Sequence, residues 1–143
     1  MRLKTDCLAW LGLTISLASC ACAAKAATIS TQMTVCGSSV LVPHVQPPPG
    51  SAPVLLMAVP CVQSRNGEIS IPRAYQQYVQ LKASRPDRGV WIPYDARAKA
   101  TMEADYRRLW ETGKFDELSI NVEDYTFENG VQGKFVTYVG HER

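Results

Sequence analysis

Apolar residues between positions 94 and 113 recur with the spacing of a helix. They lie three or four positions apart and comprise Ala98, Met102, Tyr106 and Leu109, with Trp110 beside them. This spacing places them on one side of a helix, with charged residues on the other sides. Asp95 is suited to cap the helix start with its carboxylate. Gly113 can take the left-handed conformation that ends it.

The spacing changes directly after Gly113. Leu118, Ile120 and Val122 alternate with polar residues, which predicts a half-buried strand over residues 115–126. An Asn-Gly pair follows, and residues 131–139 are rich in aromatic and β-branched side chains. Two strands joined by a short Asn-Gly connection are typical of a hairpin.

Residues 54–62 form a nearly continuous apolar run, which predicts an earlier strand buried on both faces or nearly so. Pro60 cannot donate to a strand ladder, so we expect a bulge or the strand end near it. A first helix is predicted from Ile71 and Pro72 up to a break at residues 84–89. Its apolar side carries Tyr75, Tyr78 and Val79.

The predicted order is strand, helix, helix, strand, strand. This order favours an α+β domain over residues 54–143, with a three-stranded mixed sheet and two helices on one face. The other sheet face is expected to be exposed to solvent. The order of the strands within the sheet, and therefore which strand forms an edge, stays open at this point.

The first 26 residues have the pattern of a secretory signal peptide. A basic start precedes a mostly apolar run at residues 7–18 and then small residues. Two processing routes are open. Cys20 ends a Leu-Ala-Ser-Cys sequence that resembles a bacterial lipobox and is the candidate for lipidation, whereas residues 21–26 offer small residues for ordinary cleavage. A core helix at the N-terminus is the alternative structure.

Residues 27–53 are predicted to form an arm that ends in a semi-rigid, proline-rich spacer, because three consecutive prolines favour extended polyproline II. Ordinary cleavage would leave Cys36 and Cys61, an even pair that can form a disulfide in an oxidising compartment. The segment from Thr34 to Val42 could then be an extra strand clipped to the domain. Two free thiols are the alternative.

The composition limits the chemistry. The 143 residues carry a net charge of +2, which gives no electrostatic case for nucleic acid or an anionic membrane surface. Phosphate loops and metal-binding motifs are not recognisable, so no cofactor and no metal are predicted. A thiol nucleophile at Cys36 or Cys61 with His44 as base is the one enzymatic reading, and a structural disulfide is favoured over it. An acidic run is interpreted as a solvated face: Asp116, Glu117, Glu123, Asp124 and Glu128.

The end of the second predicted helix and the start of its strand read Leu-Trp-Glu-Thr-Gly-Lys-Phe-Asp-Glu-Leu. The positions that match a family pattern are Tyr94, Asp95, Asp105, Leu109, Gly113, Phe115, Asp116 and Leu118. With the element order, this segment resembles a POTRA domain, the periplasmic repeat of BamA-like outer-membrane barrel assembly factors. Gly140 departs from the pattern, which usually has an apolar residue there.

The resemblance implies a non-enzymatic periplasmic module, located in the periplasm or at the periplasmic face of the outer membrane. It would bind unfolded outer-membrane proteins or assembly-complex subunits by strand addition, along an edge beside the helix at residues 94–112. Contact with the membrane would come only through an N-terminal lipid or a partner. The resembled proteins continue into further domains and a barrel. The alternatives are therefore a stand-alone envelope lipoprotein that docks other proteins, or a fragment of a longer assembly factor.

Overall fold

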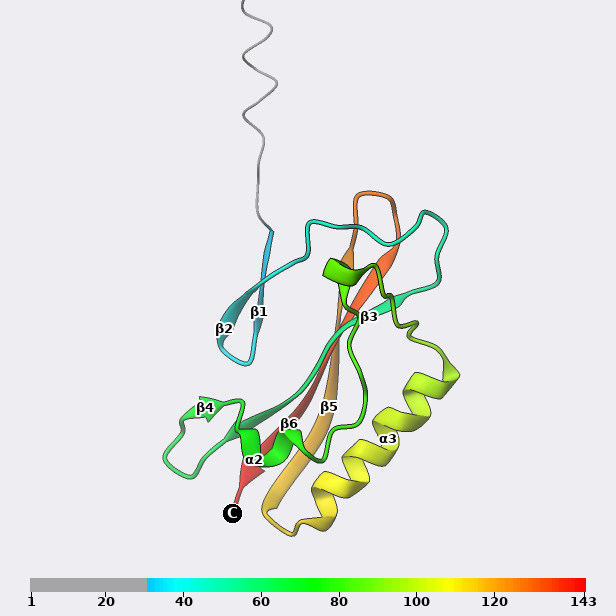
Figure 1. Ribbon diagram of the computed structural model, residues 1–143. Coiled ribbons are helices and arrows are strands. Elements are labelled where there is room, and N and C mark those ends of the chain that lie inside the picture. Colours follow the sequence, from blue (N-terminus) through cyan, green and yellow to red (C-terminus); the bar gives the residue numbers. More distant parts are fainter. Residues whose placement is uncertain (1–30) are drawn as a thin grey trace, which may run out of the picture. The chain divides into compact units, whose positions relative to one another are not determined.

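The computed structural model describes residues 31–143, and Gln32–Arg143 form one compact unit (Figure 1). The predicted signal peptide and the lipidation candidate Cys20 lie outside the described residues. The unit begins well before residue 54. The sequence assigned residues 27–53 to an arm. The described part of that range contributes two strands, within residues 32–41, to the same unit as residues 54–143.

The main sheet has four strands and mixed direction. Their spatial order is β4 (Ile69–Ser70), β3 (Val54–Gln63), β6 (Gln132–Glu142) and β5 (Phe115–Thr126). β3 is parallel to β6, and β5 is antiparallel to β6. The α+β class and the mixed sheet are confirmed, and a fourth strand of two residues extends the predicted three. The strand order left open by the sequence is now resolved, with β6 between β3 and β5.

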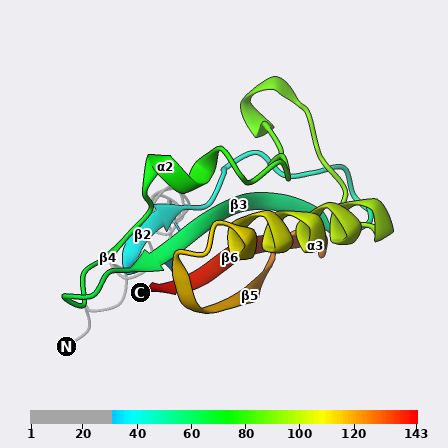
Figure 2. The same ribbon diagram turned by 90° about the horizontal axis from the view of Figure 1, so that it is seen from below.

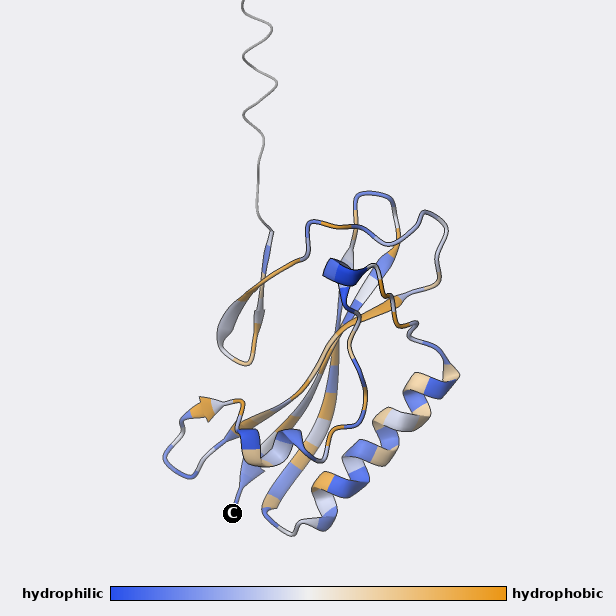
Figure 3. Cartoon of the chain, viewed as in Figure 1, coloured by the Kyte–Doolittle hydropathy of each residue, from blue (hydrophilic) through white to orange (hydrophobic). Residues whose placement is uncertain are grey.

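The helix and strand predicted from the change in spacing are both present. Helix α3 (Ala96–Glu111) begins after Asp95, whose carboxylate accepts a hydrogen bond from the Ala98 N–H at 2.9 Å. Gly113 has a φ of 70°, the left-handed value that glycine adopts without strain. β5 starts two residues later. Figure 3 shows the alternation of hydrophobic and hydrophilic residues along β5.

The first predicted helix is much shorter than expected. Helix α2 (Arg73–Gln76) is a single turn, and the chain then runs irregularly to the 3-10 turn η1 (Pro86–Arg88). The physical reason lies on α3. The buried carboxylate of Asp105 accepts hydrogen bonds from the N–H groups of Gln80 and Leu81, which a continuing helix would have used internally.

Pro60 does not end its strand. β3 continues to Gln63, and the irregularity in its pairing lies earlier, between Leu55 and Met57. β4 pairs only with Val62 and Gln63, so Pro60 lies outside that ladder. The missing N–H of the proline is thus tolerated within the strand.

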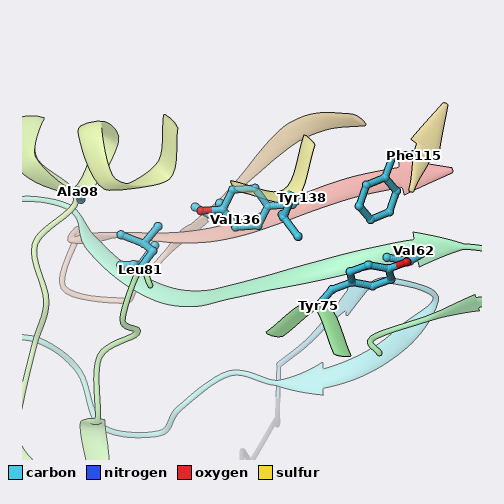
Figure 4. Packing of buried hydrophobic residues seen from close by; sticks show 9 residues of the cluster. Val62, Tyr75, Leu81, Ala98, Phe115, Val136 and Tyr138 are labelled. Atoms are coloured by element: carbon cyan, nitrogen blue, oxygen red, sulfur yellow. The ribbon is translucent and has the colours of Figure 1, made fainter. Parts of the chain in front are cut away.

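Two apolar clusters occupy the two faces of the sheet. Neighbouring residues of β6 point to opposite faces, so Val136 and Tyr138 join one cluster and Phe135 joins the other. The first cluster packs α3, Tyr75 and Leu81 against the sheet (Figure 4). Figure 2 shows α3 and α2 with the sheet seen from below.

The second face is not left to solvent. A hairpin of β1 (Gln32–Val35) and β2 (Ser38–Leu41) packs there, and its Val35 shares a cluster with Phe127 and Phe135. This corrects the expectation of one exposed sheet face, since the hairpin covers part of it. A disulfide between Cys36 at the hairpin corner and Cys61 on β3, with 5.5 Å between their Cα atoms, attaches the hairpin. The disulfide alternative in the sequence is thus the one present.

Candidate functional site

The twelve residues of β5 form one edge of the sheet. Among the described residues, β5 pairs only with β6, and its other side meets no strand. The opposite side of the sheet is covered. There Leu55 on β3 donates its N–H to the Ile92 carbonyl at 2.8 Å and accepts from the Ser84 N–H at 2.9 Å. We call the unpaired side of residues 115–126 the β5 edge.

Two contacts indicate which backbone groups point outward from β5. The Asn121 carbonyl accepts a hydrogen bond from the Thr137 hydroxyl on β6, at 3.4 Å. The Leu118 carbonyl instead accepts one from the Tyr106 hydroxyl on α3, at 3.2 Å. Because N–H and C=O groups alternate in direction along an antiparallel strand, the outward groups belong to the even-numbered residues, including Ile120.

A groove runs between α3 and the β5 edge. Its volume is about 400 Å³ and its lining residues are Glu103, Tyr106, Arg107, Leu118, Ser119 and Ile120. Tyr106, Leu118 and Ile120 are half-buried and give the groove an apolar floor. On its rim, Arg107 lies 4.0 Å from Glu103, and both side chains are largely exposed. The groove lies where the sequence placed the contact surface, beside the helix at residues 94–112.

The two faces of β5 differ in chemistry. On the α3 side, Leu118, Ile120 and Val122 are half-buried against the core. On the other side, the side chains are polar and exposed: Glu117, Ser119, Asn121 and Glu123. The predicted acidic run is therefore solvated. On β5 its two aspartates are ion-paired, whereas Glu117 and Glu123 have no ion pair among the described residues. Asp116 pairs with Arg143 at 3.2 Å and Asp124 with Lys134 at 2.7 Å.

Asp105, which the sequence placed mid-helix in the motif, is fully buried. Its carboxylate accepts the two backbone N–H groups at residues 80 and 81, the Tyr138 hydroxyl at 2.9 Å and the Arg108 guanidinium. Burial and then the Asp105 charge raise the pKa of Tyr138. The network fixes α3 against β6 and the irregular segment. Asp105 therefore holds in place the helix that forms one side of the groove. The sequence predicts charged residues on the solvent-exposed sides of this helix, but Arg108 is partly buried by this contact.

Phe115 anchors the start of β5. Its ring is buried, and its centroid lies 4.9 Å from that of Tyr75. A Cβ atom on Gly140 would lie 2.7 Å from the Phe115 ring, closer than real Cβ contacts. The departure of Gly140 from the family pattern therefore has a local cause, since only glycine leaves room for this ring. Leu109 of the motif, on α3, is also fully buried and belongs to the same apolar cluster as Phe115.

The remaining aromatic residues divide between core and surface. Tyr94 is half-buried, with the ammonium groups of Lys99 and Lys134 at 5.4 and 5.7 Å from its ring centroid. Trp110, which the spacing placed on the apolar side of the helix, is 44% exposed because it lies beside the apolar stripe of α3 and not within it. Trp91 packs with Phe127 on the other sheet face.

The cysteines, the possible metal ligands and the helices of the described residues were each a subject of the sequence predictions. Both described cysteines, Cys36 and Cys61, are in the disulfide, which removes the basis for a thiol nucleophile with His44. Within residues 31–143, no group of three or more His, Cys, Asp or Glu side chains is arranged to hold a metal ion. No helix in this part of the chain has the length and apolar character needed to cross a membrane.

The sequence did not predict one surface hollow. A hollow of about 700 Å³ lies against the irregular segment, and its lining residues are Lys82, Ala83, Ser84, Arg85, Arg88, Val90 and Ile92. From the sequence, residues 84–89 of this segment were predicted only as the break after the first helix. The signal was the recurrence of cationic residues every three positions at 82, 85 and 88.

Comparison with known proteins gives a structural likeness but no sequence relative. No family model and no curated protein matches the sequence. The structure is similar to POTRA1-3 of the periplasmic domain of Omp85 from Anabaena, with a TM-score of 0.43 and 15% identity over 82% of this chain. The chain spans 42% of that structure's length.

Proposed function

We propose that this chain is a non-enzymatic protein-binding module that binds an extended polypeptide by strand addition at the β5 edge. The observation that carries the proposal is a twelve-residue strand with one unpaired side beside an apolar groove. A segment that adds to β5 would form main-chain hydrogen bonds with the outward N–H and C=O groups. One of these, the Leu118 carbonyl, already accepts a hydrogen bond from the Tyr106 hydroxyl and would offer its second lone pair. Its alternate side chains would enter the groove over Tyr106 and Ile120.

Strand addition suits a partner class with varied sequences. Main-chain hydrogen bonds depend little on side-chain identity, so the affinity can be shared by many clients. An unpaired edge also carries a risk of aggregation, which proteins reduce with exposed charges. Glu117 and Glu123 are exposed on this strand and supply such charges. The β5 edge can therefore stay unpaired in the free protein and still accept a partner.

The setting of the proposal comes from the sequence. The signal-peptide pattern and the Cys36–Cys61 disulfide favour a compartment outside the cytoplasm, where disulfides persist. With the resemblance to POTRA domains, they support a periplasmic role in outer-membrane protein assembly. The proposed partners are unfolded outer-membrane proteins or subunits of an assembly complex. Mass spectrometry of the mature N-terminus tests the two processing routes, because a diacylglyceryl group on Cys20 identifies the lipidated form.

Photo-crosslinking tests the proposed partners. A photoreactive phenylalanine analogue replaces Ser119 on the exposed side of β5, and in a matched variant it replaces Arg88 in η1, beyond the covered edge. We expect crosslinks to newly exported outer-membrane proteins or assembly subunits from position 119 and not from position 88. Equal crosslinking from both positions, or none from position 119, contradicts the proposal.

A backbone substitution tests the binding mode. Ile120→Pro removes an outward N–H of β5 without removing a β6 ladder bond, whereas Ile120→Ala loses most of the same side chain and keeps the N–H. Fluorescence anisotropy with extended peptides should show weaker binding by the proline variant than by the alanine variant. Urea unfolding verifies that both are folded. Equal affinities would show that the β5 main chain takes no part.

A further inference from the structure

An added strand continues both faces of the sheet, so its side chains meet two chemically different rows on β5. Positions facing α3 lie beside Leu118, Ile120 and Val122, which are half-buried and apolar. Positions on the other face lie beside the exposed Glu117, Ser119, Asn121 and Glu123. Side chains directly opposite each other on neighbouring strands interact, and opposite charges are favourable there.

On β5, the two glutamates are the carboxylates without an ion pair among the described residues. Asp116 and Asp124, their sequence neighbours, each have one, from Arg143 and Lys134 respectively. No lysine or arginine of the described residues lies within 4.0 Å of the Glu117 or Glu123 carboxylates. Glu123 receives only a hydrogen bond from the Asn121 amide, at 3.3 Å. Both ends of this polar row therefore present unpaired negative charge.

This charge pattern disfavours a second copy of the chain as the occupant. Two β5 strands that pair antiparallel about a two-fold axis, with the same face continuing across both, overlap best when centred near Ile120. That register sets Glu117 opposite Glu123 of the other copy, on both sides of the axis. Like charges directly opposite each other are destabilising. The edge is therefore better suited to a different chain than to itself.

We propose that the β5 edge selects strands in which apolar residues alternate with polar ones and the polar row carries two basic residues six positions apart. This rests on the proposed strand addition at β5. The apolar row covers Tyr106, Leu118 and Ile120, and the two basic residues lie opposite Glu117 and Glu123. Strict alternation is the pattern of a sheet strand with one apolar face. The spacing of the charges is the specific element of the proposal.

Three peptides test the selection. Each has a seven-residue core that alternates valine with polar residues, an uncharged fluorophore and glycine-serine flanks. The first core is Lys-Val-Thr-Val-Thr-Val-Lys, and the other two replace both lysines with glutamine or with glutamate. We expect the lysine peptide to bind about 4- to 25-fold more tightly than the glutamine peptide, from roughly two- to fivefold per charge pair. The glutamate peptide should bind most weakly.

Two double variants assign the preference to the named glutamates. Glu117→Gln with Glu123→Gln should abolish the preference for lysine while the glutamine peptide binds unchanged. The matched control is Glu68→Gln with Asp87→Asn, which removes the same charge from exposed residues beyond the β3 side of the sheet. The control should keep the full preference. Raising the ionic strength should also reduce the preference, because exposed charge pairs are screened.

The outcomes separate the two proposals. Equal binding of all three peptides, each weakened by Ile120→Pro, overturns the charge selection and retains strand addition. A preference for lysine that survives in the double glutamine variant also overturns it. If none of the three peptides binds, or if all bind Ile120→Pro and Ile120→Ala equally, the strand-addition site itself is wrong and the selection falls with it.

Discussion

The two edges of the sheet are completed in opposite ways. On the β3 side, β4 pairs with the strand end, and residues 84–92 donate and accept main-chain hydrogen bonds at Leu55. On the β5 side, twelve residues have no strand partner among the described residues. The same chain thus covers parts of one edge with residues 69–70 and 84–92 and leaves the other without a strand partner.

This difference shows that local contacts determine whether each edge of the sheet is covered. Covering the β3 side depends on Asp105, whose carboxylate holds the irregular segment at Gln80 and Leu81. The β5 side instead combines an apolar groove with exposed carboxylates, which keep an edge soluble. Breaking the covered edge should cost folding stability. Changing the β5 edge should cost binding.

The largest effect is expected from Asp105→Ala. It leaves the Tyr138 hydroxyl and two backbone N–H groups without their partner and removes the ion pair of Arg108. We expect the free energy of unfolding in urea to fall by about 3–5 kcal/mol. Hydrogen exchange should accelerate first at Leu81 and Leu55. Glu103→Ala, on the exposed side of α3, is the control and should change stability by no more than about 0.5 kcal/mol. A similar loss in both variants contradicts the role of Asp105.

Loss of the disulfide should have the next largest effect. The bond closes a loop with a sequence separation of 25 residues, so its removal in Cys61→Ala should cost about 3 kcal/mol. Reduction of the wild-type protein should give the same loss and should not affect the variant further. Peptide binding at the β5 edge should persist while the protein remains folded, since the hairpin lies by β3. Loss of binding in a folded Cys61→Ala variant would mean that the two regions are coupled.

Gly140→Ala addresses the anchoring of β5. The new methyl group would overlap the Phe115 ring, so overpacking should destabilise the protein by about 1–3 kcal/mol in urea unfolding. Adding Phe115→Leu to this variant should cost less than Phe115→Leu costs in the wild type, because the smaller side chain relieves the overlap. Strictly additive losses in the double-mutant cycle would show that the two residues do not share this space.

The smallest effect is expected from the pH dependence at Tyr75. Burial, with the hydrogen bond from its hydroxyl to Glu142 at 2.7 Å, raises the pKa of Tyr75 to about 12 from 10.0. A raised folded-state pKa stabilises the protein fully below pH 10, and this contribution is lost as the pH rises towards 12. At pH 11 the loss is roughly 1.4 kcal/mol. Urea unfolding at pH 9, 10 and 11 measures it. Tyr75→Phe should show a shallower decline, and an unchanged slope would contradict this role.

The sequence was sufficient where a signal is local. The change from helical to strand spacing at Gly113, the cap at Asp95 and the Asn-Gly turn each act within a few residues. The same segment contains the apolar residues of the groove, so the candidate surface could be located before the strand order was known. The edge itself could not be assigned, because a strand is an edge only through the absence of a neighbour.

The errors came from contacts between distant residues. The length of α2 was overestimated because Asp105 binds Gln80 and Leu81 from 24 or more positions away. The β1–β2 hairpin was missed because its corner is Cys36, with a φ of 54°, followed by Gly37. Turns of this kind favour Asn, Asp or Gly, so the cysteine gave no turn signal. The outward position of Trp110 depends on how α3 packs against the sheet, which the spacing of apolar residues along the helix does not determine.

The position of β6 has a consequence for the order of folding. Both long ladders of the sheet run through this strand, which is the last along the described chain, while β3 is the first strand of the main sheet. The β3–β6 pairs join residues 78 or 79 positions apart, so this ladder can form only after both segments are available. An emerging chain thus has no completed sheet to hold it folded.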